Sequence, residues 1–146
     1  MSKTIVLATD HAGFKLKEHV KNFLQNKGHN IKDFGALEYD SLDDYPDFII
    51  PAAKHIAEHN LIGIIFGGSG QGEAMAANRI KGIRAAVFYN GPNEIVELSR
   101  MHNNANILSI GARFLSNQEA ESIIELWLSA DFEEGRHEKR INKLDS

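Results

Sequence analysis

Cysteine is absent from all 146 residues. Its absence excludes a disulfide framework, a zinc ribbon and a thiol nucleophile, and it fits a reducing compartment. Long hydrophobic runs are absent too: the first apolar run, "TIVLAT", is followed at once by Asp10 and His11. That run is too short for a signal peptide or a membrane span. We therefore expect a cytoplasmic protein with no membrane partner.

An excess of basic residues is also missing. The formal net charge is -4 and the acidic and basic residues are interleaved, so we expect no nucleic-acid partner. No linker, low-complexity tract or repeat interrupts the chain, and 42% of its residues are hydrophobic. These features predict a single domain over residues 1–146, with a basic helical tail at about 133–146.

Strand-like runs alternate with helix-like runs along the chain. Strands are expected at 4–9, 29–34, 61–66, 82–88 and 105–111, and helices at 13–28, 44–60, 73–80, 92–101 and 117–130. Gly28 should stop the first helix, and Asp44 should cap the second. The alternation predicts a doubly wound, Rossmann-like parallel sheet of five strands with helices on both faces. We assume the strand order 2-1-3-4-5, which opens a ligand crevice between strands 1 and 3.

The stretch "FGGSGQGEAMAANR" (66–79) follows the third strand and resembles a phosphate-binding loop. Nucleotide fingerprints require glycine or lysine where this chain has Glu73, and a carboxylate there would repel a polyphosphate. Loop N–H groups and the Ser69 hydroxyl could instead hold an oxyanion that develops while Glu73 removes a proton beside a carbonyl. The alternative is an ordinary strand–helix turn, with Glu73 favoured by the helix dipole.

Two further pairs of polar residues are candidates. Asp10 and His11 end the first strand at the proposed crevice, although Asp10 could merely cap the next helix in an Asx turn. His102 and Asn103 follow the fourth helix, which runs back along the sheet for about 15 Å. His102 should thus lie at the opposite end of its own subunit. It is either a solvated helix end or part of a second subunit's crevice.

The tail "GRHEKR" places Arg136, His137 and Arg140 within one or two helical turns. Such a group suits a phosphate dianion, or it is a solvated face paired with nearby glutamates. The run "HIAEH" (55–59) matches a zinc-peptidase pattern. No obvious third ligand accompanies it, so we interpret its histidines as helix-end residues.

The chain resembles the type B ribose-5-phosphate isomerase family, which includes galactose-6-phosphate isomerase subunits. The resemblance runs almost end to end, through "DHAGF", "DYPDF", "GGSGQGEAMAANRIKGIRAA", "SRMHNNANILSIGAR" and "GRHEKR". It implies an aldose–ketose isomerase of the pentose phosphate pathway, acting on a phosphorylated sugar through a cis-enediol. It also implies a homodimer or a dimer of dimers with shared active sites, no organic cofactor and no metal.

The same resemblance implies a role for each matching residue. Glu73 would be the base between C1 and C2, and Ser69 and the loop amides would hold the enediolate. His102 would open the sugar ring, and Asp10 would handle a hydroxyl proton. The residues implied to bind the substrate are His11, Gly68, Gly70, Gly72, Asn103, Arg113, Arg136, His137 and Arg140.

Part of that family has a cysteine base where this chain has Gly67, so the chain looks like the branch with a glutamate base. Two other functions stay open on the residues alone. One is an isomerase of a six-carbon aldose phosphate, such as allose or galactose 6-phosphate. The other is a phosphosugar-binding module without catalysis, in which Glu73 is only a helix-start acid.

Overall fold

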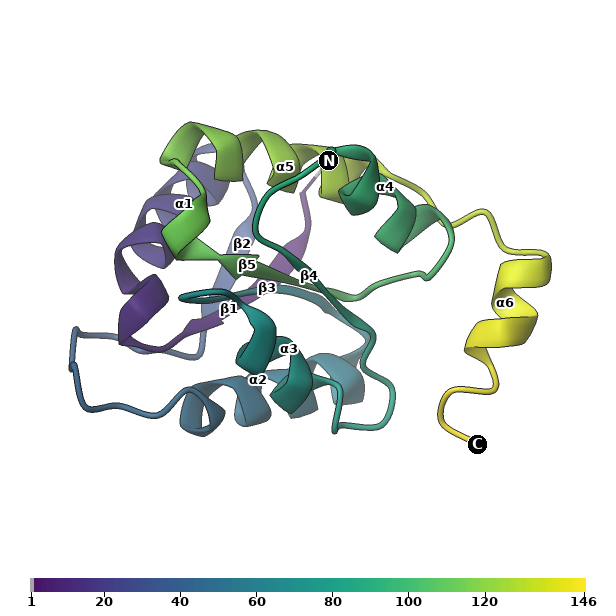
Figure 1. Cartoon of the computed structure of the whole chain (residues 1–146), viewed down its shortest axis with the longest axis horizontal. Coiled ribbons are helices and arrows are strands. Elements are labelled where there is room, and N and C mark those ends of the chain that lie inside the picture. Colours follow the sequence, from purple (N-terminus) through teal and green to yellow (C-terminus); the bar gives the residue numbers. More distant parts are fainter. Residues whose placement is uncertain (1) are drawn as a thin grey trace.

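A computed structural model describes residues 2–146, and the five strands within them form one parallel sheet (Figure 1). The order across the sheet is β2-β1-β3-β5-β4. The strands are β1 (Thr4–Thr9), β2 (Asn30–Asp33), β3 (Ile62–Gly67), β4 (Ala85–Phe88) and β5 (Ile107–Gly111). The expected doubly wound α/β class is therefore confirmed.

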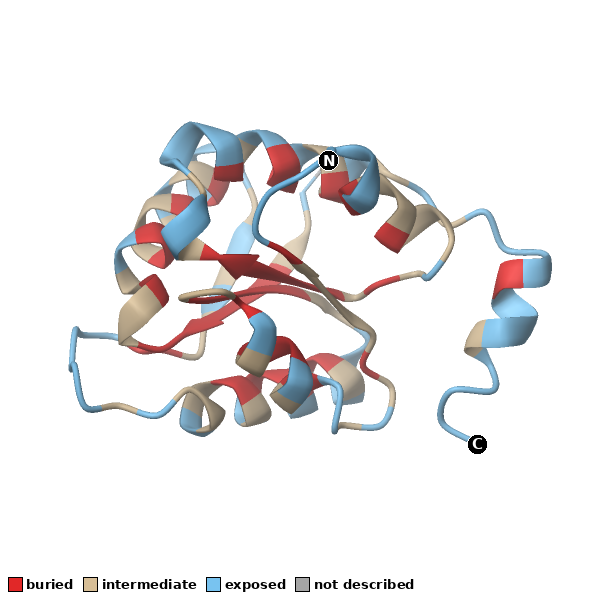
Figure 2. Cartoon of the chain, viewed as in Figure 1, coloured by how far each residue is buried: buried red, intermediate tan, exposed pale blue. Residues whose placement is uncertain are grey.

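Helices cover both faces of the sheet. The first face carries α1 (Phe14–Asn26), α4 (Glu94–Met101) and α5 (Asn117–Ser129), and the second carries α2 (Pro46–His59) and α3 (Gln71–Ala77). Each face has its own apolar core, and the central strands between the two are buried (Figure 2). Short 3-10 turns follow β1 (η1, His11–Gly13) and β5 (η2, Ala112–Phe114). The last helix, α6 (Arg136–Ile141), stands away from the sheet (Figure 1).

The assumed strand order was wrong for the last two strands, because β5 lies between β3 and β4. All five residues of β5 are buried, whereas three of the four in β4 are only partly buried. The strand β4 is the edge strand and pairs only with β5, so its side chains are less covered than those of β5, although "AAVF" is wholly apolar. The reversal of winding still falls between β1 and β3, so the place of the crevice is unchanged.

The start of α2 also differs from expectation. Tyr45 is the N-cap residue and Pro46 the first helical residue, so Asp44 does not cap the helix with its side chain. The Asp44 backbone carbonyl instead accepts the N–H of Asp47 at 3.2 Å. Gly28 follows α1 with a φ of +91°, as expected of a residue that ends a helix. Among residues 2–146, every helix is too short or too polar to cross a membrane.

Candidate active site

The loops after β1, β3 and β5 meet at the carboxyl edge of the sheet. Thr9 pairs in register with Phe66, and Phe66 with Ile110, so the three strands end side by side. The Thr9 hydroxyl donates to the Phe66 carbonyl at 3.0 Å and fastens the end of β1 to the end of β3. The sheet therefore fixes the relative positions of the residues that follow these strands.

The glycine loop turns sharply between β3 and α3. Gly70 has a φ of +78°, a conformation that glycine adopts without strain, and α3 begins directly after it. The Gly70 carbonyl accepts the Ser109 hydroxyl at 2.6 Å, so β5 holds the loop from behind. The Ser69 hydroxyl accepts the Gln71 N–H at 3.3 Å and stays partly exposed. The loop is a tight turn held by a bond from β5, with Ser69 partly exposed.

Glu73, in the first turn of α3, is buried, with only 5% of its surface exposed. Its carboxylate lies directly against the Cα of Gly67, where a Cβ would overlap both carboxylate oxygens. Burial raises the pKa of Glu73 and the negative charge of Asp10 raises it further, while a backbone N–H bond opposes them. A desolvated carboxylate of raised pKa has the character of a general base.

Asp10 accepts the Ala12 N–H at 3.0 Å and caps η1, so the capping role that we considered for it is present. The same side chain is close enough to Glu73 to raise the pKa of that glutamate. A cap and a proton-handling carboxylate are compatible, because one Asp10 oxygen takes the cap bond and the other remains available.

His11 is held by Asp43, a residue that the sequence reasoning missed. One Asp43 oxygen accepts from the His11 backbone N–H at 3.0 Å and lies 2.7 Å from His11 Nδ1. The bond to Asp43 raises the pKa of His11, with burial opposing it and the charge of Asp10 assisting. The other Asp43 oxygen is buried and unpaired among the described residues. Sequence spacing could not reveal this pair, because 32 residues separate its members.

Arg113 and Tyr45 pack on two different glycines of the loop. The Arg113 guanidinium lies over Gly68, about 3.0 Å from where a Cβ would stand, and its backbone N–H donates to the Gly68 carbonyl at 3.1 Å. The Tyr45 ring packs in the same way on Gly72. Arg113 thus brings a cation to the loop that carries Glu73. Tyr45 belongs to the "DYPDF" segment, to which the residues alone had given no function.

The remaining predicted residues lie elsewhere. His102 caps the carboxyl end of α4, just before β5 begins, and so lies at the opposite edge of the sheet, as its helix predicted. His102 stacks on His137 with ring centroids 4.2 Å apart. Asn103 lines a hollow near the start of β4, and both arginines of α6 are exposed. The fold therefore separates His102, Asn103, Arg136, His137 and Arg140 from Glu73.

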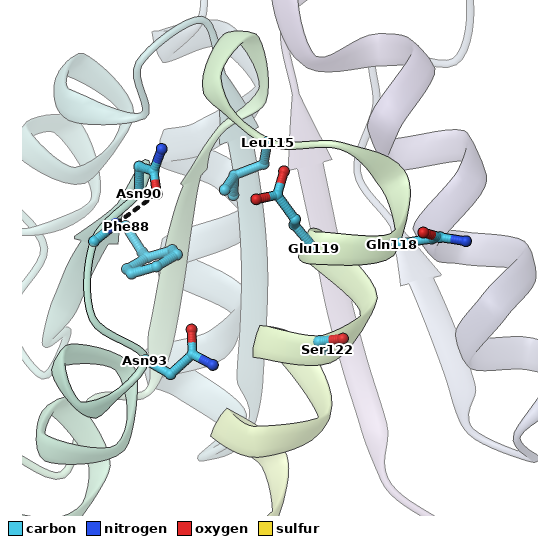
Figure 3. Close-up of a pocket in the computed structure, with 8 residues that line it drawn as sticks. Phe88, Asn90, Asn93, Leu115, Gln118, Glu119 and Ser122 are labelled. Carbon is cyan, nitrogen blue, oxygen red and sulfur yellow. Dashed lines mark hydrogen bonds between the residues drawn. The ribbon is translucent and has the colours of Figure 1, made fainter.

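A cavity of about 340 Å³ lies between the end of β4 and the first turns of α5 (Figure 3). Its side chains include Asn90, Asn93 and Gln118, and among the described residues that line it only Glu119 titrates. Bonds from Ser116 lower the pKa of Glu119, because that carboxylate completes the N-terminal cap of α5. This cavity offers no free base, and the Glu73 crevice is the better catalytic candidate.

Two clusters of three residues bring together side chains that can ligate a metal ion: Asp10, His11 and Asp43, and separately His102, Glu133 and His137. In the first cluster, the bond between His11 and Asp43 already occupies a ring nitrogen and a carboxylate oxygen. The two histidines of "HIAEH" lie side by side with ring centroids 4.2 Å apart and planes tilted by 33°, and they belong to neither cluster.

The comparisons with known proteins all indicate the same family. Residues 5–144 match the family model described as "Ribose/Galactose Isomerase". A probable ribose-5-phosphate isomerase B of Mycoplasma genitalium is 38% identical over 99% of this chain and 95% of its own. The ribose-5-phosphate isomerase B of Mycolicibacterium paratuberculosis is 40% identical over 96% of this chain and 88% of its own.

Solved structures agree with these sequence matches. The ribose-5-phosphate isomerase B of Mycoplasma genitalium, solved with bound ribulose-5-phosphate, superposes with a TM-score of 0.91 at 38% identity, covering 97% of this chain and 93% of the other. The Thermotoga maritima enzyme gives a TM-score of 0.92 at 42% identity, covering 98% and 97%.

Proposed function

Because the chain belongs to the ribose/galactose isomerase family, we propose that it interconverts D-ribose 5-phosphate and D-ribulose 5-phosphate. The observation that carries the proposal is Glu73, a buried carboxylate of raised pKa at the edge of the sheet where β1 and β3 end side by side. The Mycoplasma genitalium relative, whose structure holds ribulose-5-phosphate, supports the choice of sugar.

In the proposed reaction Glu73 takes the proton from C2 of the open-chain aldose. The electrons of that C–H bond form the C1–C2 double bond, and the carbonyl oxygen on C1 becomes the enediolate oxygen. Glu73 then returns the proton to C1 while the hydroxyl on C2 becomes the new carbonyl. Asp10, which lies close enough to raise the pKa of Glu73, passes a proton between the two oxygens. One base can serve both carbons because they are adjacent.

The glycine loop is proposed to stabilise the enediolate. The Ser69 hydroxyl and the amides of Gly70 and Gly72 would donate to the developing oxyanion. Support comes from the rigidity of the loop, because donors already held in place need no reorganisation when the charge appears. Gly68 and Gly72 also leave room for the arginine and tyrosine that pack on them.

The phosphate is proposed to lie between His11 and Arg113 on one chain and Arg136, His137 and Arg140 on a second copy. Asp43 supports the role of His11, because it raises the pKa of that imidazole and so favours the protonated form that donates to a phosphate. His102 of the second copy would open the sugar ring, and its Asn103 would bind sugar oxygens.

This assignment requires a dimer, or a dimer of dimers, because His102 lies at the edge of the sheet opposite Glu73. An exposed side chain beside the edge strand β4 supports the proposal. Met75 on α3 is 65% exposed and, with Ala85 and Val87, lines a hollow that also holds Gln71, Asn78 and Arg79. Light scattering should report a stable dimer, and a fully active monomer would refute the shared site.

Mixing two inactive variants tests the shared site directly. In a mixed dimer of Glu73→Gln and His102→Ala chains, one of the two sites has both Glu73 and His102 intact if the site is shared. Half of the dimers are mixed after equilibration, so about one quarter of wild-type activity should return. If both residues served the same chain, every site would be defective and mixing would restore nothing.

The test of the activity itself is ribulose 5-phosphate formation from ribose 5-phosphate, with EDTA present, by the wild type and Glu73→Gln. Glutamine keeps the shape and removes the base, so the rate should fall by about 10²–10⁴-fold. Exchange of the C2 proton with solvent should fall in parallel. A wild type that binds the sugar phosphate without exchange would instead be a binding module. A larger kcat/KM on allose or galactose 6-phosphate would replace the pentose assignment.

We further propose a place in the pentose phosphate pathway and a cytoplasmic location. The pentose phosphate substrate supports the first, and a cysteine-free chain that needs no oxidising compartment supports the second.

A further inference from the structure

A cluster of three metal-ligating side chains lies away from the Glu73 crevice, where α6 meets the carboxyl end of α4. His102 ends α4, His137 lies in α6, and their rings stack at 4.2 Å with planes 13° apart. Glu133 precedes α6, and its backbone N–H donates to the Met101 carbonyl at 3.0 Å. That bond fixes Glu133 beside the end of α4 and so beside both imidazoles.

The spacing of the three ligand atoms suits a tetrahedral ion. His102 Nε2 lies 3.5 Å and His137 Nε2 3.6 Å from the same oxygen, Glu133 Oε1. Zinc binds histidine nitrogen and carboxylate oxygen at about 2.0–2.2 Å, so two ligands of a tetrahedral zinc ion lie about 3.4 Å apart. All three atoms lie within 4.8 Å of one another. Because a metal ion lies in the plane of each imidazole that binds it, the two stacked rings must turn apart to direct both nitrogens at one ion.

We propose that His102, Glu133 and His137 form a binding site for a divalent transition-metal ion such as Zn²⁺, and that the bound ion inhibits the enzyme. Two imidazoles and one carboxylate are a ligand set that zinc takes in open sites, with water in the fourth position. His102 and Glu133 are 37% and 46% exposed, so the ion and its water can enter.

A metal ion binds histidine through the lone pair of a neutral imidazole, so protons compete with the ion for His102 and His137. Arg136 and Arg140 lie in the same helix as His137 and repel a cation, so we expect weaker binding than in a closed four-ligand site.

The second histidine pair of the chain, His55 and His59 on α2, provides a control. The centroids of these rings also lie 4.2 Å apart, although the rings are tilted by 33°; His55 packs on Phe34, and His59 Nδ1 lies 3.0 Å from the His55 carbonyl. Among the described residues, this pair has no carboxylate that completes a group of three ligands. Binding that needs only two adjacent histidines would occur there equally.

The inhibitory effect rests on the proposed function, because His102 and His137 are the residues assigned to ring opening and phosphate binding. An ion held between them would occupy the imidazoles that the sugar phosphate needs. The inhibition should therefore be competitive with ribose 5-phosphate and reversed by EDTA. The ion would be an inhibitor, separate from the chemistry assigned to Glu73.

The experiment uses the full chain. Zn²⁺ is titrated by calorimetry, and Co²⁺ by its visible absorption, which is intense when four ligands surround the ion tetrahedrally. The wild type should bind one ion per chain. Glu133→Gln and His137→Gln should each weaken binding by at least tenfold, since even partners one step removed from a metal contribute about 10–100-fold. The double variant His55→Gln, His59→Gln should bind as the wild type does, and circular dichroism confirms that each variant is folded.

An absence of Zn²⁺ and Co²⁺ binding by the wild type, or binding that only the α2 double variant loses, overturns the proposal. The activity measurement uses Glu133→Gln, because Glu133 has no part in the proposed reaction. The isomerase activity of this variant should resist Zn²⁺ at concentrations that inhibit the wild type. Equal sensitivity of the two proteins also overturns the proposal. If the isomerase assignment is wrong, the metal titrations still test the proposed site, because they need no turnover.

Discussion

The contact between Gly67 and Glu73 gives a sharp test of the site, by the substitution Gly67→Ala. The added methyl group would overlap both oxygens of the Glu73 carboxylate. Gly67 is the last residue of β3 and is held in register against β5, so the backbone cannot easily retreat. The carboxylate must move instead, away from the position that it needs for proton transfer.

The displacement of the carboxylate predicts a loss of rate and a loss of stability. A catalytic group misplaced by about 1 Å can lose about 100-fold in rate, so kcat on ribose 5-phosphate should fall by about that factor. KM should change little, because the phosphate contacts lie elsewhere. Overpacking a buried site typically costs about 1–3 kcal/mol, and urea denaturation should show this loss in the free energy of unfolding.

The matched control is the same change made in a Glu73→Ala background. There the space taken by the carboxylate is empty, so Gly67→Ala should cost almost nothing in stability, and the double-mutant cycle should show strong coupling. An equal loss of stability in both backgrounds would refute the overlap as its cause. A fully active Gly67→Ala single variant would refute the position of the base.

Two further predictions concern ionisation. Burial raises the pKa of Glu73, so kcat/KM should decline as the pH falls through that raised pKa. A decline only near the ordinary glutamate pKa of 4.5 would contradict the burial of the base. Because the folded-state pKa is the higher one, wild-type stability relative to Glu73→Gln should improve as the pH falls through it, and the gain should be complete below the unfolded value. Asp43→Asn should lower the pKa of His11, measured by NMR titration, and raise KM about tenfold with little change in kcat. An unchanged His11 pKa would refute the role of Asp43. Asp40→Asn is the comparison: the Asp40 charge contributes less to the raised pKa of His11, so this change should lower that pKa less.

The sequence by itself determined the class of fold and the loops that form the crevice. Apolar runs such as "LIGIIF" are typical of strands buried on both faces, and helical runs between them favour parallel crossovers. The winding reversal between β1 and β3 then brings Asp10 and Glu73 to one edge. The direction of the fourth helix also predicted correctly that His102 lies at the other edge.

Only the tertiary structure decided which strands are neighbours and which side chains meet. The order of β5 and β4 depends on how completely each strand is covered, a property of the packed sheet. The bond between His11 and Asp43 joins residues 32 positions apart. The close contact between Gly67 and the Glu73 carboxylate forms only in the folded turn between β3 and α3. Local sequence sets the hydrophobic period and the backbone preferences of each segment. Burial arises only when distant segments pack together and exclude water, and the shift in the pKa of a buried base arises with it.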